Sequence, residues 1–194
     1  MKKILIILLL MFMLCSCKGK EEVTEVNYTY DIISSNVDMS AYEGVSSTNH
    51  NFRLITVSEL FNTIDQESSG IFYLGRANCG CCQRVCRYID EVARELDVTV
   101  YYIDVYNENE PLTEKEVQDQ LFEYLFEILG KDENGNKTLL TPHLFSVING
   151  KFYKDEICFD NLQLDPDPTK EQVEKLKNVY REIMKPFSSK TDPV

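Results

Sequence analysis

A short apolar run that leads directly into a dense group of cysteines limits the fold of this 194-residue chain more than any other feature. Residues 71–74 read Ile-Phe-Tyr-Leu, which is typical of a central strand buried on both faces. Four cysteines follow closely: Cys79, Cys81, Cys82 and Cys86. Apolar residues then recur every three or four positions as far as Leu96, which predicts an amphipathic helix. The cysteines therefore lie where a buried strand meets the start of a helix.

Strand and helix patterns alternate along the rest of the chain. Strands are predicted over residues 52–55, 98–105, 144–148 and 151–157, with the hairpin signal Asn149-Gly150 between the last two. Helices are predicted over residues 56–67, from the capping box of Thr113 and Glu116 to Gly130, and from Asp167 to Pro186. The order β-α-β-α-β-α-β-β-α predicts an α/β fold, in which helices flank a central mixed sheet.

The N-terminal residues have the pattern of an export signal. Lys2 and Lys3 precede an apolar run over residues 4–14, which is too short to span a bilayer because spanning takes about 20 residues. The segment Leu14-Cys15-Ser16-Cys17 resembles a bacterial lipoprotein signal. That resemblance implies removal of residues 1–16 and a lipid anchor on Cys17 at the extracytoplasmic face of the cell membrane. An uncleaved N-terminal anchor is the alternative, and it also places the rest of the chain outside the cytosol.

The remaining residues divide into three parts. Residues 17–51 are polar and keep no regular period, so we interpret them as a tether. Four apolar residues inside this tether either form one strand or dock on the domain: Tyr28, Tyr30, Ile32 and Ile33. Residues 52–186 form the predicted domain, and residues 187–194 form a C-terminal tail.

The charge balance excludes one large class of function. The chain has 32 acidic and 20 basic residues, which gives a formal net charge of −12. Nucleic-acid binding requires a clustered basic face that neutralises phosphates, so no nucleic-acid partner is expected.

The spacing of Cys79 and Cys82 indicates thiol–disulfide chemistry. The first turn of a helix has unpaired N–H groups and a partial positive charge, and both stabilise a thiolate. A thiolate, not a thiol, attacks a disulfide. We therefore predict that Cys79 is the exposed nucleophile, and that Cys82 faces the core and resolves the mixed disulfide. This chemistry needs no cofactor beyond the dithiol, and a falling pH slows it by protonating Cys79.

These features resemble the thioredoxin-like superfamily. The matching parts are residues 71–74, the Cys79/Cys82 pair, Thr141-Pro142 before a strand, and the Asn149-Gly150 hairpin. Residues 72–79 and 100–104 are more closely similar to the thioredoxin-like bacteriocin transport accessory proteins of Gram-positive bacteria.

The resemblance covers residues 52–184 and implies a thioredoxin-like fold with thiol–disulfide oxidoreductase activity of unknown direction. It also implies a cis bond before Pro142, with the Thr141 backbone facing Cys79 and pairing with bound peptide. The sequence departs from thioredoxin at Tyr73, where a buried acid is typical, and at Gly80-Cys81, where Gly-Pro is usual.

The sequence leaves three functions open. The favoured one is a membrane-anchored oxidoreductase that acts on cysteines of exported proteins or peptides and is recycled by an unidentified redox partner. The second is copper or zinc handling by the cysteines with His143, since thiolate and imidazole suit these metals. The third is a non-catalytic accessory lipoprotein for peptide export.

Three further thiols have open roles. Cys81 lies in the variable position between the paired cysteines and is a possible additional redox group. Cys86 is either a third redox partner or a small buried core residue, and Cys158 is interpreted as structural or idle.

Overall fold

A five-stranded mixed sheet forms the centre of the protein. The computed structural model describes residues 25–105, 115–157 and 168–189. The strand order is β1-β3-β2-β6-β7. The three parallel strands β1, β3 and β2 are joined on one side by the antiparallel strands β6 and β7. The strands span Phe52–Leu54 (β1), Gly70–Gly75 (β2), Val100–Asp104 (β3), His143–Ile148 (β6) and Lys151–Ile157 (β7). The predicted α/β class with a central mixed sheet is confirmed.

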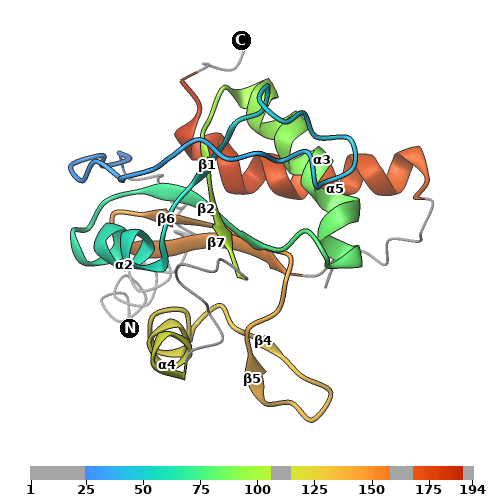
Figure 1. Ribbon diagram of the computed structural model, residues 1–194. Helices are drawn as coiled ribbons and strands as arrows, with labels where there is room; N and C mark the ends of the chain where they lie inside the picture. Colours follow the sequence, from blue (N-terminus) through green and yellow to red (C-terminus); the bar gives the residue numbers. More distant parts are fainter. Residues whose placement is uncertain (1–24, 106–114, 158–167, 190–194) are drawn as a thin grey trace, which may run out of the picture.

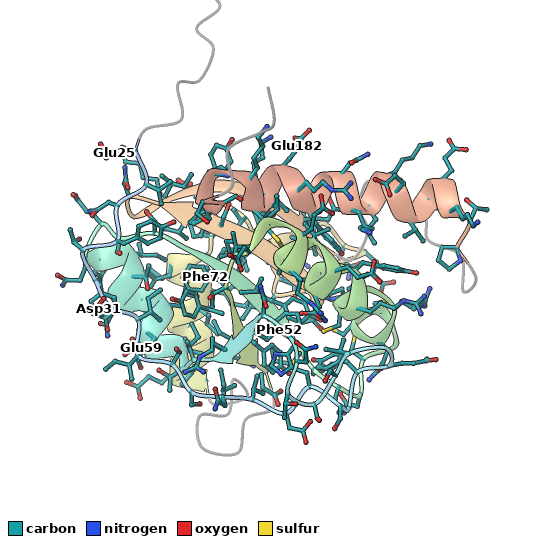
Figure 2. All side chains as sticks on the ribbon, turned by 90° about the horizontal axis from the view of Figure 1, so that it is seen from above. Glu25, Asp31, Phe52, Glu59, Phe72 and Glu182 are labelled. Atoms are coloured by element: carbon teal, nitrogen blue, oxygen red, sulfur yellow. The ribbon has the colours of Figure 1, made fainter. Side chains whose placement is uncertain are left out.

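Two helices pack on each face of the sheet (Figure 1). The helices are α2 (Val57–Asp65), α3 (Gly80–Leu96), α4 (Lys115–Tyr124) and α5 (Lys170–Met184), with a 3₁₀ turn η1 (Lys185–Phe187) after α5. Helices α3 and α5 share a core with Tyr73 of β2, whereas α2 and α4 share one with Phe72 and Leu74. This division follows from the alternation of side chains along a strand. Figure 2 shows Phe72 in the interior and Glu182 pointing outward from α5.

Threonine side chains cap the start of helices α2 and α5. The Thr56 hydroxyl accepts a hydrogen bond from the Glu59 N–H at 3.3 Å at the start of α2. Thr169 and Gln172 form a capping box at the start of α5. Thr113, the expected cap of α4, lies outside the described residues. Each cap satisfies N–H groups that the first turn of a helix leaves unpaired.

Helix α4 is shorter than its apolar period predicts. The helix ends at Tyr124, and tight turns carry the chain on to Gly130. Leu125 and Leu129 lie after the end of the helix but are buried in the same core as its Leu121 side chain. The apolar spacing of the sequence therefore extends beyond the helix itself. A small hairpin of β4 (Gly130–Lys131) and β5 (Lys137–Thr138) then projects away from the sheet, where only a polar turn was expected (Figure 1).

The N-terminal strap, defined here as residues 34–51, is part of the folded body. Three of its side chains lie in the core beside α3: Met39, Tyr42 and Val45. Asn51 donates its backbone N–H to the buried Asp90 carboxylate at 3.0 Å, and Gln83 donates its side-chain amide to the Ala41 carbonyl at 2.7 Å. The strap therefore differs from the expected tether, because short turns bury its apolar side chains without a regular period.

Residues 25–33 dock on α2 and do not form a strand. The Tyr30 hydroxyl donates to Glu59 at 2.9 Å, and the Ile33 N–H donates to the same carboxylate at 2.8 Å. Tyr28 and Ile33 remain exposed. At the other end of the chain, the Ser188 hydroxyl donates to the Leu96 carbonyl at 2.8 Å, so the first residues of the expected tail also contact the domain.

The expected lipoprotein signal lies outside the described residues, as do Cys17 and Cys158. Within residues 25–105, 115–157 and 168–189, no helix has the length and apolar content needed to cross a bilayer.

The burial of Met39 gives a direct test of the strap. Replacing Met39, which is 0% exposed, by Ala should lower the free energy of unfolding by about 2–5 kcal/mol, because it leaves a cavity beside α3. Ile33→Ala is the matched control, since Ile33 is 73% exposed and its loss should change stability by less than about 0.5 kcal/mol. Urea unfolding of both variants measures the difference. Equal stability of the two variants would contradict the packed strap.

Candidate active site

Cys79 is the residue that caps α3. It has an extended backbone, and its Sγ accepts a hydrogen bond from the Cys82 N–H at 3.4 Å. Its own N–H donates to the Arg76 carbonyl at 3.2 Å, which closes the turn between β2 and α3. The sulfur therefore lies at the positive end of the helix, where N–H groups that lack helical partners stabilise negative charge.

The loop before β6 brings a second group to the same sulfur. The Thr141–Pro142 peptide bond is cis, as the resemblance implied. The Cys79 thiol donates to the Thr141 carbonyl at 3.7 Å, and the Thr141 hydroxyl donates to the Cys79 Sγ at 3.9 Å. The expected position of Thr141 opposite Cys79 is therefore present, while the pairing of Thr141 and Pro142 with a bound peptide stays a prediction.

The two cysteines of the C-x-x-C motif have opposite electrostatic environments. Partial burial alone would raise the pKa of Cys79, but hydrogen bonds from Cys82, Thr141 and the Cys81 backbone outweigh it and lower this pKa. Burial raises the pKa of Cys82 to about 12, and the neighbouring Cys79 acts in the same direction. The thiolate therefore forms first at Cys79, and the fully buried Cys82 keeps its proton.

The two additional thiols near the site lie in different surroundings. Cys86 is 0% exposed, and its pKa is raised by burial, by Asp90 and by Cys82. This environment favours the buried-core interpretation, because a reactive cysteine is accessible and has a lowered pKa. Cys81 is partly exposed on the first turn of α3, and its possible redox role stays a prediction. All four cysteines of the cluster are free thiols in this structure.

Three tyrosines form an aromatic layer beneath the cysteines. Tyr73 stacks on Tyr102 with ring centroids 5.7 Å apart, and Tyr42 lies 6.5 Å from Tyr73. The Tyr42 and Tyr102 hydroxyls are hydrogen-bonded at 2.9 Å. Sequence reasoning noticed Tyr73 only as a departure from thioredoxin. It missed Tyr42, because nothing in the irregular pattern of the strap indicates where that ring packs.

The structure does not bring His143 to the cysteines. His143 is buried, and its Nε2 lies 3.1 Å from Asp155 Oδ2. Its ring packs on Phe145, which belongs to the core of α2 and α4, whereas Cys82 belongs to the core of α3 and α5. The described ranges contain no group of three or more His, Cys, Asp and Glu side chains placed to hold a metal ion. The alternative of a metal site made by the cysteines with His143 is therefore not supported by the described part of the chain.

The comparisons with known proteins give similarity only at the level of structure. No family model and no curated protein matches the chain. Thioredoxin O2 from Arabidopsis thaliana has a TM-score of 0.41 at 19% identity, with 71% of this chain and 98% of that chain covered. Thioredoxin from Trypanosoma brucei brucei has a TM-score of 0.40 at 14% identity, with 73% and 99% covered.

The described elements themselves define a thioredoxin-like fold with a C-x-x-C site. Its strand order is β1-β3-β2-β6-β7, its helices cover both faces, and a cis-proline precedes β6 opposite the first cysteine.

The hydrogen bonds to Cys79 predict a measurable pH dependence. Because the pKa of Cys79 is lowered, its alkylation by iodoacetamide should persist below the pH at which an ordinary cysteine is protonated, and should fall as the pH drops through the lowered value. Thr141→Val removes one donor, so alkylation at acidic pH should slow about two- to fivefold. Peptide mass spectrometry measures the rate at each cysteine.

Thr138→Val on the projecting hairpin is the matched control for Thr141→Val and should leave the pH profile unchanged. Alkylation of Cys82 as fast as that of Cys79 would contradict the assignment of the low pKa to Cys79.

Proposed function

We propose that the protein is a thiol–disulfide oxidoreductase that uses Cys79 and Cys82. The single observation that carries the proposal is the placement of Cys79. Its sulfur caps α3, faces Thr141 across the cis peptide, and is in hydrogen-bond contact with the N–H of Cys82. One half-exposed thiol of lowered pKa is thereby paired with one buried thiol of raised pKa, three residues later on the same helix.

The reaction divides into two exchanges between sulfur atoms. The Cys79 thiolate attacks one sulfur of a substrate disulfide, the substrate S–S bond breaks, and the other substrate sulfur leaves as a thiolate. Cys82 then loses its proton and attacks the Cys79 sulfur of the mixed disulfide. The second substrate sulfur leaves and takes up a proton. Two electrons pass to the substrate, and Cys79 and Cys82 become joined in a disulfide. The same steps in reverse oxidise a substrate dithiol.

The different pKa values and burial of the two thiols determine which cysteine reacts first. A Cys82 thiol with a pKa of about 12 is protonated at neutral pH, so it does not compete with Cys79 for the incoming disulfide. Its full burial also prevents an external disulfide from reaching it. Cys82 therefore reacts only after Cys79 has brought a substrate sulfur to the site.

We further propose that the protein works outside the cytosol, held at the cell membrane by a lipid on Cys17. The support is the basic start, the apolar run over residues 4–14 and the Leu14-Cys15-Ser16-Cys17 segment. The substrates in this proposal are cysteine-containing exported proteins or peptides, and a separate redox partner recycles the dithiol. The resemblance to bacteriocin transport accessory proteins supports peptide export as the setting.

Single cysteine replacements test the proposed chemistry. Cys79→Ser should abolish exchange with a fluorogenic peptide disulfide, because the attacking sulfur is lost. Cys82→Ser should retain the first exchange and accumulate a mixed disulfide on Cys79, visible by intact mass. Cys86→Ala is the control, since Cys86 is a core side chain, and it should keep turnover near the parent rate.

Cys79→Ser protein that turns over substrate at the parent rate would remove the proposed mechanism. A parent protein that forms no mixed disulfide would favour the non-catalytic accessory function.

A further inference from the structure

The Tyr73 hydroxyl is a buried donor that is left without a hydrogen bond. Tyr73 is 0% exposed, and its hydroxyl has no hydrogen-bond partner among the described residues. A buried hydroxyl in this state costs about 1–3 kcal/mol, and a Phe at the same position would avoid that cost. The Tyr73 hydroxyl therefore has a donor proton that no hydrogen bond of this structure uses.

The surroundings hold this hydroxyl in place. Gly75 lies two residues along the same strand, and a Cβ at that position would meet Tyr73 Cζ at 2.6 Å and Oη at 2.7 Å. The ring therefore lies over the bare backbone of Gly75, toward the end of β2 from which the chain enters the cysteine loop. Tyr102 stacks on one side at 5.7 Å, and Phe52 packs at 5.9 Å. These rings restrict rotation of the phenol away from the site.

The side chains of Cys82 and Cys86 on α3 belong to the same buried core cluster as Tyr73. Burial is the main cause that raises the pKa of Cys82 and of Cys86, but the Tyr73 side chain acts in the opposite direction on both. A group that lowers the pKa of a thiol stabilises its thiolate form. The other hydroxyls of the layer are already engaged, because Tyr42 and Tyr102 bond to each other at 2.9 Å.

We propose that Tyr73 supplies the hydrogen bond that stabilises the Cys82 sulfur while Cys82 resolves the mixed disulfide. This inference rests on the proposed function. In that step Cys82 loses its proton, its sulfur bonds to the Cys79 sulfur, and the bond from Cys79 to the substrate sulfur breaks. The departing substrate sulfur takes up a proton, so the protein gains one disulfide and releases one thiol. Tyr73 keeps its own proton throughout.

The protonation state of Tyr73 fits this role. Burial raises the pKa of Tyr73 well above its usual value, and Cys86, Tyr42 and Cys82 act in the same direction. The phenol therefore remains neutral at physiological pH. It can donate a hydrogen bond to the Cys82 thiolate without placing a second negative charge beside it. The hydrogen bonds that favour the Cys79 thiolate come from Cys82, Thr141 and the Cys81 backbone, so the first exchange does not depend on Tyr73.

A single-turnover experiment separates the two exchanges. The reduced full chain is mixed with less than one equivalent of 5,5′-dithiobis(2-nitrobenzoate), quenched in acid at intervals, and mapped by peptide mass. The thionitrobenzoate adduct on Cys79 reports the first exchange, and the Cys79–Cys82 disulfide reports the second. Tyr73→Phe should leave the first rate unchanged and slow the second about tenfold, the effect of one hydrogen bond to a charged group.

Tyr102→Phe is the matched control, because it removes a hydroxyl from the same layer while retaining the ring. It should leave both rates near the parent values. Thermal unfolding adds a second readout. Tyr73→Phe should be at least as stable as the parent. Tyr102→Phe should be less stable, because it leaves the buried Tyr42 hydroxyl without its hydrogen-bond partner.

Each remaining outcome decides against the inference. If Tyr73→Phe forms the disulfide at the parent rate, or if both variants slow it equally, Tyr73 has no specific part in resolution, although the proposed function stands. If the parent forms the adduct but never the Cys79–Cys82 disulfide, the proposed function itself fails and the role of Tyr73 fails with it.

Discussion

The hydrogen bond from the Cys82 N–H to the Cys79 Sγ is the interaction on which the site depends. It exists because α3 begins directly after the turn that follows β2, so that the first cysteine takes the position of the N-cap. The antiparallel pairing of β2 with β6 supplies the other half of the site. Leu74 pairs with His143, and this register places the cis Thr141–Pro142 bond beside the start of α3. A slip of this register would separate the two halves.

The same geometry gives two neighbouring thiols different chemistry. The N-cap sulfur receives backbone N–H groups and is partly open to solvent, whereas the sulfur one turn later faces the core. Desolvation penalises the thiolate at Cys82, and local hydrogen bonds favour it at Cys79. The aromatic layer beneath is polar only at its hydroxyls, and the Tyr73 hydroxyl has no hydrogen-bond partner among the described residues. The chemistry of the pair thus follows from position along a single helix.

Much of this arrangement follows from the sequence, because its signals are local. The apolar run over residues 71–74, the spacing of the cysteines and the Asn149-Gly150 turn each depend on neighbouring residues, and the corresponding elements form as expected. The cis bond before Pro142 came from the resemblance and not from the physical pattern.

The parts that could not be predicted depend on contacts between distant residues. Tyr42 bonds to Tyr102 across 60 positions, and no periodicity of the strap indicates that contact. Helix α4 ends at Tyr124 although its apolar spacing continues, since Leu125 and Leu129 reach the core through turns. His143 follows Pro142 directly, yet the alternation of side chains along β6 directs it to the opposite core, where it meets Asp155.

Disulfide mapping of the gently oxidised full chain, by peptide mass with and without a reductant, tests the central claim most directly. The account predicts one reductant-sensitive bridge that joins residue 79 to residue 82 and leaves the thiol of residue 86 free. A protein that keeps both of these sulfurs unbridged under oxidation, or that bridges either one to a different cysteine, would contradict it.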